Sequence, residues 1–484
     1  MTIGWHFDNT YSKLSNIFKE EIKPTPVHDP KLIILNDKLA KDLNLNFSEI
    51  EKKDLSQIFS GNSLPEGSAT LAQAYAGHQF GHFTMLGDGR AILLGEHLVN
   101  NNRFDVQFKG SGKTSFSRSG DGRAVLGPML REYIISEAIN ALNIPTTRSL
   151  AVTSTGEKVF REKAFPGAIL TRIASSHIRV GTFQYAAFKG SLEIQKKLLD
   201  YTINRHFKDI KDIEYPGIQF LKSMMLKQID LTINWMRVGF IHGVMNTDNM
   251  SINGETIDYG PCAFMDSYNP STCFSSIDFN KRYSFQNQKI ITQWNLARFA
   301  ETLIPFLDKS IKKSVNFAQE IIESFDECFS EKWKIMMKCK LGILNSEKGD
   351  NKIISDLLSW MEKNSVDYTN TFCHLISEKK TNDPIYNSIE FNNWYKNWKN
   401  RIKRNNKPIT DSFKLMKNYN PRVIPRNHIV EESLIAFSEN NDPKSFNELI
   451  KILSDPYNYE KNIKKKYTLP NLNKDYFYET FCGT

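Results

Sequence analysis

The sequence predicts an α+β protein in which strands gather in the first part of the chain and helices in the second. An apolar run at 91–94 and alternating apolar residues at 104–108 indicate two neighbouring strands joined by a polar turn, and 144–174 reads as further strands. From residue 192 onward the apolar spacing becomes that of amphipathic helices. We therefore expect three parts: an N-terminal extension at 1–70, a strand-rich lobe at 71–185, and a mostly helical C-terminal lobe at 186–484.

Helices are predicted wherever apolar residues recur at helical spacing. Gly127 and Pro128 begin one of them, because proline is favoured in the first turn of a helix. The segment 378–410 is rich in Asn and Lys and is expected to be a surface excursion. The other predicted helices lie at 217–240, 287–308, 311–343, 350–363 and 443–454.

Composition indicates an ordinary soluble protein. The 484-residue chain is 40% hydrophobic and 24% charged, and its net charge of +9 comes from lysines spread along the chain. No basic stretch combines interleaved aromatic residues with a nucleic-acid motif. No segment reaches the roughly 18 apolar residues of a membrane span, and Asp8 falls where a signal peptide would be apolar. We expect a cytoplasmic monomer that binds neither nucleic acid nor membrane.

Histidine and cysteine do not form a convincing metal site in the sequence. His78 and His82 lie four residues apart and could share a helix face, but no acidic third ligand stands at a metalloprotease spacing. Packing or hydrogen bonding is the favoured role for both. The six cysteines are scattered without a C-x-x-C pair, which argues against a zinc knuckle and a disulfide scaffold.

A stretch near the middle of the chain, HGVMNTDNMSINGETIDYG, carries polar residues in a pattern typical of an active centre. A protein-kinase catalytic loop has a histidine, an aspartate base two residues later, a metal-binding asparagine five residues after that, and a D-F-G step downstream. His242, Asn249 and Asp258 keep this pattern, whereas the base position is Val244. The sequence thus predicts a protein-kinase-like two-lobed fold. The protein is either an inactive kinase or an enzyme whose chemistry has moved to Asp248.

Glycine-rich turns upstream of this stretch are typical of phosphate binding. The turn at 87–90 leads into a strand, so its backbone amides could approach phosphates while Arg90 adds donors, although a tight turn explains Gly-Asp-Gly equally well. Lys109 ends the next strand, where a kinase places its phosphate-binding lysine. The turn at 119–123 is either a connector or a phosphate clamp. The segment 110–114 is not a P-loop, because the required earlier glycine is absent.

Charged residues on the following helix and strands could complete this site. Glu132 and Glu137 flank the apolar stripe of the predicted helix on opposite sides. Either could pair with Lys109, and periodicity does not choose between them. Arg172 ends a predicted strand and Arg179 follows one loop later. Two arginines near a glycine-lined cleft suit a polyphosphate, although ordinary salt bridges explain them as well.

Taken together, these segments resemble the selenoprotein O family of kinase-like proteins. The resemblance rests on AGHQFGHF, LGDGRA, FKGSGKTSFSRSGDGRAVLGPMLREY, SEAINALNIPTTRSLAV, HGVMNTDNM, IDYGPCAFMD and NPRVIPRNHIVE. It covers nearly the whole chain, and long strings match in order, which a shared fold alone would not produce. It implies an enzyme that moves AMP from ATP, or UMP from UTP, to Ser, Thr or Tyr hydroxyls of proteins and releases pyrophosphate.

The resemblance also implies roles for individual residues. ATP is held so that its α-phosphate faces the attacking hydroxyl, and Glu132 becomes the partner of Lys109. Asp248 is the implied proton acceptor, while Asn249 and Asp258 are the implied ligands of Mg²⁺, with Mn²⁺ as an alternative. The implied nucleotide-binding residues are Gly87, Gly89, Arg90, Lys109, Asp121, Gly122, Arg172, Arg179 and Asp258.

Physical chemistry agrees with this assignment. Nucleotidyl transfer needs neutralised phosphate charge, which Mg²⁺ with lysine and arginine provides, and a base near the attacking oxygen. Because nearby cations lower the basicity of an aspartate, we expect positioning of the hydroxyl to matter more than strong deprotonation. Two alternatives stay open: a non-catalytic nucleotide-binding pseudokinase scaffold, and a phosphotransferase that uses Asp248.

The same resemblance implies a regulatory disulfide. Many relatives end in a redox-active selenocysteine or cysteine motif, and this chain ends in TFCGT with Cys482. Cys273 follows the D-F-G-like step, where relatives place a partner cysteine. A disulfide between Cys273 and Cys482 is therefore implied, against free thiols in a reducing cytoplasm.

Overall fold

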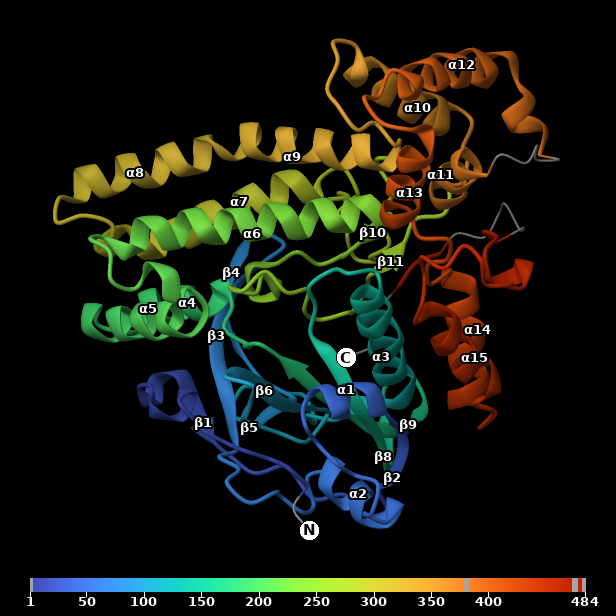
Figure 1. Cartoon of the computed structure of the whole chain (residues 1–484). Helices are drawn as coiled ribbons and strands as arrows, with labels where there is room; N and C mark the ends of the chain where they lie inside the picture. The colour runs from blue at the N-terminus through green and yellow to red at the C-terminus, as the bar shows by residue number, and fades with distance from the viewer. Residues whose placement is uncertain (1–2, 378–382, 472–477, 481–484) are drawn as a thin grey trace.

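A computed structural model describes residues 3–377, 383–471 and 478–480 (Figure 1). Within these residues the early part of the chain forms an antiparallel sheet, and most of the rest is helical. The sheet occupies the lower half of Figure 1, and long helices cross above it. The expected mixed fold, with strands early and helices late, is confirmed.

The main sheet has nine strands in the part of the chain that the structure describes. Its order is β1-β3-β5-β6-β9-β8-β2, with β4 paired to β3 and β7 paired to β9. The predicted extension supplies the strands at the two ends of this order, so it is built into the sheet. The strands are β1 (Lys19–Glu21), β2 (Lys31–Leu35), β3 (Leu71–Gln79), β4 (His82–Gly87), β5 (Ala91–Val99), β6 (Asn102–Lys109), β7 (Ala124–Val125), β8 (Arg148–Phe160) and β9 (Ala164–Ala174).

The β5–β6 hairpin brings Lys109 to the first glycine-rich turn. Asn100 and Asn101 have positive φ angles of 50° and 62°, the backbone that a tight hairpin turn requires and that asparagine tolerates. The hairpin pairs Val99 with Asn102 and, after a register shift between Leu93 and Gly95, Ala91 with Lys109. The backbone N–H of Gly110 donates to the carbonyl of Arg90 at 2.7 Å, which ties the end of β6 to the turn at 87–90.

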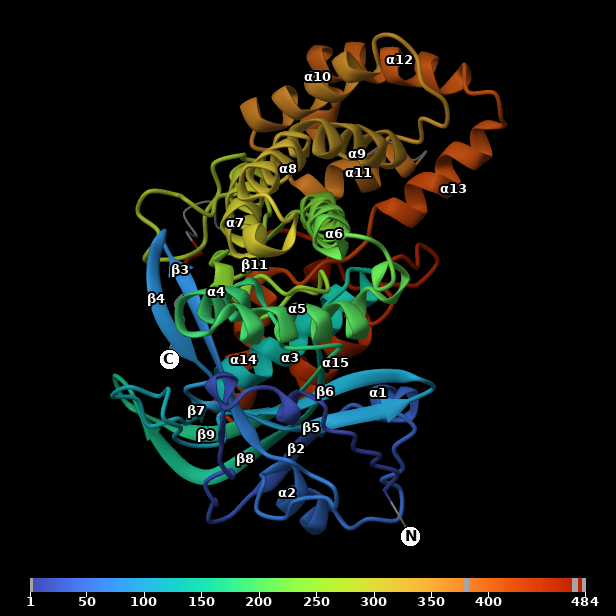
Figure 2. The same ribbon diagram turned by 90° about the vertical axis from the view of Figure 1, so that its left-hand side faces the viewer.

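The helices lie around the sheet and form most of the rest of the described structure (Figures 1 and 2). α3 is apolar on most of its surface because it packs between β8 and β9 on one side and α14 and α15 on the other. The helices are α1 (Asp37–Asp42), α2 (Lys52–Phe59), α3 (Leu126–Ala141), α4 (Val180–Lys189), α5 (Leu192–His206), α6 (Pro216–Val238), α7 (Gln288–Leu303), α8 (Ile311–Glu323), α9 (Phe325–Lys340), α10 (Asp350–Lys363), α11 (Tyr368–Ile376), α12 (Ile389–Lys403), α13 (Ile409–Tyr419), α14 (Asn427–Ser438) and α15 (Lys444–Leu453).

The motif-bearing stretch directly follows α6. This helix has Pro216 in its first turn and ends at Gly239, whose φ of 75° makes a left-handed cap. The chain then forms the short strand β10 (Phe240–Ile241), the 3-10 turn Thr247–Asn249 and the strand β11 (Ala263–Phe264), which pairs antiparallel with β10. The polar motif residues thus lie in a loop whose two ends are held together by the pairing of β10 with β11.

Two expectations about the helices were wrong. The predicted helix at 311–343 is divided into α8 and α9 at Ser324, whose hydroxyl donates to the Ile321 carbonyl at 2.7 Å and competes with the helical ladder. The predicted surface excursion at 378–410 contains α12, which buries Trp394 and Trp398. Residues 378–382 lie outside the described part.

Among the described residues, none of the helices combines the length and the apolar character that crossing a bilayer requires.

Candidate active site

A cavity of about 910 Å³ lies between the sheet and the helical part of the chain. Its walls come from the glycine-rich turns, from α3 and from the loop between β10 and β11. The structure thus brings together motifs that are far apart in the sequence. The predicted site residues that line the cavity are Gly87, Gly89, Arg90, Lys109, Asp121, Gly122, Glu132, Arg172, Arg179, Asp248, Asn249 and Asp258.

Lys109 pairs with Glu132 at the buried end of this cavity. Its Nζ donates to Glu132 Oε2 at 2.7 Å, and the Arg172 guanidinium donates to Glu132 Oε1 at 2.8 Å. Burial opposes ionisation of Glu132, but Arg172 and Lys109 outweigh it and lower the pKa of the carboxyl. Glu137, the alternative partner, instead binds Arg148 through two hydrogen bonds of 2.8 and 2.7 Å.

Asp258 completes a four-residue charge cluster. Its Oδ1 accepts hydrogen bonds from Lys109 Nζ at 2.7 Å and from Arg172 Nη2 at 2.8 Å. Burial opposes its ionisation, but Lys109, Arg172 and Arg179 hold its pKa well below the usual range. Its φ of 62° is unfavourable for a residue with a side chain. The ion pairs stabilise this backbone and favour the ionised form of the carboxylate, which lines the cavity.

Arg179 links this cluster to the loop that carries Asp248. The buried guanidinium donates from Nη1 to the Asp248 carbonyl at 3.1 Å and from Nε to the His177 carbonyl at 3.2 Å. It also lies over the Tyr75 ring, 4.3 Å from the centroid. Asp258 Oδ2 is 3.9 Å away from its Nη1. Arg179 is therefore a fixed positive charge between the two aspartates.

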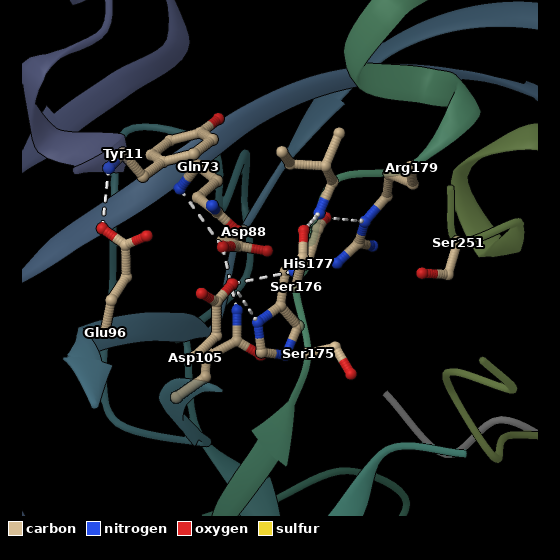
Figure 3. A network of polar contacts seen from close by, with 12 residues as sticks. Tyr11, Gln73, Asp88, Glu96, Asp105, Ser175, Ser176, His177, Arg179 and Ser251 are labelled. Atoms are coloured by element: carbon tan, nitrogen blue, oxygen red, sulfur yellow. Dashed lines mark hydrogen bonds and ion pairs between the residues drawn. The ribbon is translucent and has the colours of Figure 1, made fainter. Parts of the chain in front are cut away.

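A second buried network fixes the backbone that precedes Arg179 (Figure 3). Asp105 accepts hydrogen bonds from the backbone N–H of His177 at 2.8 Å and from its Nδ1 at 3.0 Å. Arg205 in turn donates to Asp105 at 2.6 Å and to Glu96 at 2.7 Å. Burial lowers the pKa of His177 to about 4, so its ring is neutral near pH 7 and Nδ1 carries the donated proton.

Asp248 has the environment of a proton acceptor. It lies in the turn Thr247–Asn249 and is 6% exposed. Burial raises the pKa of its carboxyl to about 6, although Arg179 opposes the rise. Its Oδ1 has no hydrogen-bond partner among the described residues. A carboxylate that lines the cavity and has a pKa close to ambient pH is suited to general base chemistry.

Asn249 and Asp258 have atoms that suit a magnesium ion. Asn249 Nδ2 donates to the Val244 carbonyl at 3.1 Å, which leaves its Oδ1 for a ligand. Asp258 uses Oδ1 for its ion pairs with Lys109 and Arg172, and in the described part of the chain Oδ2 is approached only by Arg179. The described residues contain no group of three His, Cys, Asp or Glu side chains that could hold a metal alone. The pair therefore fits Mg²⁺ held jointly with phosphates and water, its usual arrangement.

Glycines allow the two glycine-rich segments to stack on each other. A Cβ at Gly87 would lie 2.3 Å from the Phe116 ring, and one at Gly89 would lie 2.8 Å from the Phe116 carbonyl oxygen. Gly122 has a φ of 69°, and a Cβ there would lie 2.2 Å from the Gly112 backbone. These positions exclude side chains, so the backbone itself forms this wall of the cavity.

Asp88 braces the first glycine-rich turn. Its Oδ2 accepts from the Gln73 backbone N–H at 3.2 Å (Figure 3) and from Gln107 Nε2 at 3.1 Å, while its carbonyl accepts from Thr114 Oγ1 at 2.8 Å. Burial raises the pKa of Asp88 to about 6. Local sequence pattern predicts no separate role for Asp88. A carboxylate between two glycines of a tight turn indicates a bracing role, because a buried carboxylate needs hydrogen-bond partners.

Asp121 is bound by Arg161, a residue that local sequence pattern does not single out. Arg161 donates to the two Asp121 carboxylate oxygens at 2.8 and 3.1 Å. Arg161 and Arg118 both line the cavity. Arg161 lies in the turn between β8 and β9, and only the pairing of β7 with β9 brings that turn to residues 119–123.

The histidines have structural positions. His242 is buried, and its Nε2 lies 2.9 Å from the Ile257 carbonyl, which joins the two halves of the loop. His78 and His82 lie in β3 and β4 of one hairpin, so they do not share a helix face. The His78 ring packs edge-on against Trp294 at 5.2 Å, in line with the packing role that was favoured.

Cys273 lies beside the described end of the chain, whereas Cys482 is outside the described residues. The Cys273 thiol donates to Asp278 at 3.3 Å. Burial raises the pKa of this thiol to about 11, which keeps it protonated near neutral pH. The backbone N–H of Thr480 donates to the Phe274 carbonyl at 2.7 Å, next to Cys273.

Comparison with known proteins identifies the family. The family model described as protein adenylyltransferase SelO matches residues 2–454. A protein nucleotidyltransferase YdiU of Pelagibacter ubique is 55% identical over 485 residues, covering 100% of both chains. Proteins with the same name from Nitrosococcus oceani and Bacillus mycoides are 54% and 52% identical, covering 100% and 99% of this chain and 98% and 99% of their own.

These matches span essentially the whole chain, at identities far above the level at which family membership is in question. They agree with the motif strings found in the sequence and with the charged, glycine-lined cavity in which those strings meet. The prediction that the chain is a nucleotidyltransferase enzyme is confirmed. This chain belongs to the SelO family of protein adenylyltransferases.

Proposed function

We propose that this chain transfers AMP from ATP to hydroxyl side chains of proteins in a Mg²⁺-dependent reaction. The observation that carries the proposal is the buried cluster of Lys109, Glu132, Arg172 and Asp258 at the end of the cavity. We further propose that the fold is a protein-kinase-like one, with lobes at 71–185 and 186–484 and an extension at 1–70. The relatives' names as protein nucleotidyltransferases support protein acceptors.

Cations of the cluster are proposed to bind the triphosphate. Lys109, Arg172 and Arg179 all have nitrogen atoms within 4 Å of Asp258, so phosphate oxygens can replace the carboxylate as acceptors in a low-dielectric site. Asn249 and Asp258 would hold Mg²⁺, which would add positive charge at the phosphate that is attacked. Because the arginine and lysine charges are fixed before the nucleotide binds, they need not reorganise when negative charge develops in the transition state.

The backbone wall is proposed to bind the rest of the nucleotide. Gly87, Gly89 and Gly122 place main-chain atoms where side chains are excluded, which permits close approach of phosphate or ribose. Arg90 lines the same wall. Asp121 would contact the nucleotide from the turn at 119–123, where Arg161 binds its carboxylate.

Asp248 is proposed to accept the proton of the attacking hydroxyl. The hydroxyl oxygen forms a bond to the α-phosphorus, and the bond from this phosphorus to the bridging oxygen of the pyrophosphate breaks. Pyrophosphate leaves with the bonding electron pair, and the hydroxyl proton moves to the carboxylate. A pKa of about 6 leaves Asp248 mostly ionised at neutral pH while keeping it more basic than an ordinary aspartate.

A nucleotide labelled at one phosphate tests the proposal. The chain is incubated with Mg²⁺, a bacterial protein extract and ATP labelled at either the α or the γ position. We expect label in protein only from α-labelled ATP, and none when a chelator removes Mg²⁺. Transfer of γ label would instead favour the phosphotransferase, and transfer from neither would favour a nucleotide-binding scaffold. Competition by unlabelled UTP measures whether UMP is transferred as well.

A disulfide between Cys273 and Cys482 is proposed as a regulator of this activity. The hydrogen bond from Thr480 to Phe274 and the bridge between Thr480 and Ser275 support it, because they hold Thr480 beside Cys273. The raised pKa of the Cys273 thiol predicts slow disulfide formation, since only the thiolate attacks. Mass spectrometry of a non-reduced digest should show the linked peptides after oxidant. Free thiols alone after prolonged oxidation would dismiss the disulfide.

A further inference from the structure

The end of β3 lies directly against the turn Thr247–Asn249. This part of the chain belongs to the AGHQFGHF string, which has so far served only to identify the family. The backbone N–H of His78 donates to Thr247 Oγ1 at 2.7 Å, and that of Phe80 donates to Asn246 Oδ1 at 3.1 Å. The strand therefore holds two side chains that immediately precede Asp248.

Gln184 of α4 closes a ring of hydrogen bonds with these residues. Thr247 Oγ1 donates to Gln184 Oε1 at 2.6 Å, and Gln184 Nε2 donates to His78 Nδ1 at 2.8 Å. The directions agree only if the His78 ring is neutral with its proton on Nε2. Thr247 is fully buried and Gln184 is 5% exposed, so water does not compete for the bond between them.

Two glycines allow strand, helix and turn to approach this closely. A Cβ at Gly77 would lie 2.1 Å from Asp248 Oδ1, and a Cβ at Gly181 would lie 1.9 Å from the Ala76 carbonyl oxygen. The Asp248 carboxylate is thus packed against the backbone of β3 and has little room to move. Its direction depends on how the turn is seated on β3.

We propose that His78, Gln184 and Thr247 form a positioning ring that aims the Asp248 carboxylate at the attacking hydroxyl. None of these three side chains lines the cavity, so they act through Asp248 and touch neither nucleotide nor acceptor. The proposal rests on the function proposed above. It predicts that loss of the ring slows the transfer step and leaves ATP binding unchanged.

Thr247→Val tests the ring because valine keeps the shape of threonine and removes its hydroxyl. We expect kcat for transfer of α label to fall about 100-fold, the effect of a small misplacement of a catalytic group. KM for ATP should stay within about twofold of the parent value, since the lost contact stabilises only the transition state. Thr247→Ser restores the hydroxyl and should recover most of the lost rate.

Gln184→Ala removes the ring from its other side and provides a second variant if Thr247→Val fails to fold. The double variant should be no slower than the worse single variant, because one broken bond already opens the ring. Thr202→Val is the matched control. It removes a fully buried hydroxyl whose one bond within the described structure is to the Leu198 carbonyl of its own helix, and it should keep the parent kcat.

The outcomes separate this inference from the proposed function. If the parent chain transfers α label and both Thr247→Val and Gln184→Ala match its kcat, the ring has no positioning role. A fall in kcat together with an equal rise in KM for ATP would also overturn it, because the ring would then act on nucleotide binding. If the parent chain transfers no α label, the proposed function itself fails, and the ring fails with it.

Discussion

Asp258→Asn should reduce nucleotidyl transfer by roughly 1,000-fold, because the loss of a charged metal ligand removes several kcal/mol of transition-state stabilisation. Asparagine has the shape of aspartate and tolerates the left-handed backbone at this position. The variant therefore removes charge without adding backbone strain. Lys109 and Arg172 both keep Glu132 as a partner, so the fold should be retained. Initial rates at several Mg²⁺ concentrations measure the effect.

Asp356→Asn provides a matched control for this variant. Asp356 lies in α10, is exposed and among the described residues pairs only with Lys352 on the same helix, where an ion pair contributes little. Its transfer rate should equal that of the parent. Full activity of Asp258→Asn at low Mg²⁺ would contradict the assignment of Asp258 as a metal ligand.

Glu132→Ala should lower the free energy of unfolding by about 3–5 kcal/mol and abolish transfer. The two buried cations Lys109 and Arg172 would then share a single carboxylate, Asp258, and uncompensated buried charge is strongly destabilising. The freed lysine would also lose the partner that holds it at the phosphate position. Denaturant unfolding and the labelled-ATP assay measure the two effects.

Glu137→Ala separates loss of the fold from loss of the site. Glu137 lies on the same helix and also binds an arginine, Arg148, but it does not line the cavity. We expect this variant to lose stability while keeping the KM for ATP of the parent. If Glu137→Ala lost transfer as completely as Glu132→Ala, the effect of Glu132 would be one of folding alone.

The hydrophobic pattern predicted the framework of the site well. The strands that carry Lys109 and Arg172 and the helix that carries Glu132 could be placed from local alternation and helical spacing. Local pattern could not choose between Glu132 and Glu137, because both flank the buried stripe. The choice depends on Arg148, which reaches Glu137 only after β8 forms.

Contacts between distant segments were beyond local pattern. His78 and Thr247 are 169 residues apart, and no periodicity relates a strand end to a turn in the helical part. Arg161 reaches Asp121 only through strand pairing. These residues are ordinary in their local sequence, and they acquire their roles from packing.

The wrong predictions in the helical part also come from the limits of local sequence pattern. α12 has Phe391, Trp394, Trp398 and Ile402 on one buried face, among abundant Asn and Lys. The average polarity of the segment concealed this stripe, which a count at helical spacing would have found. The break at Ser324 left the apolar spacing of the flanking helices undisturbed.

The mass of the group added to protein tests the central claim most directly. A bacterial extract is incubated with this chain, ATP and Mg²⁺, and modified peptides are sequenced by tandem mass spectrometry. The account predicts adenosine monophosphate on Ser, Thr or Tyr side chains, with pyrophosphate released in equal amount. Peptides that carry phosphate alone, or no modification above that of the Asp258→Asn variant, would contradict it.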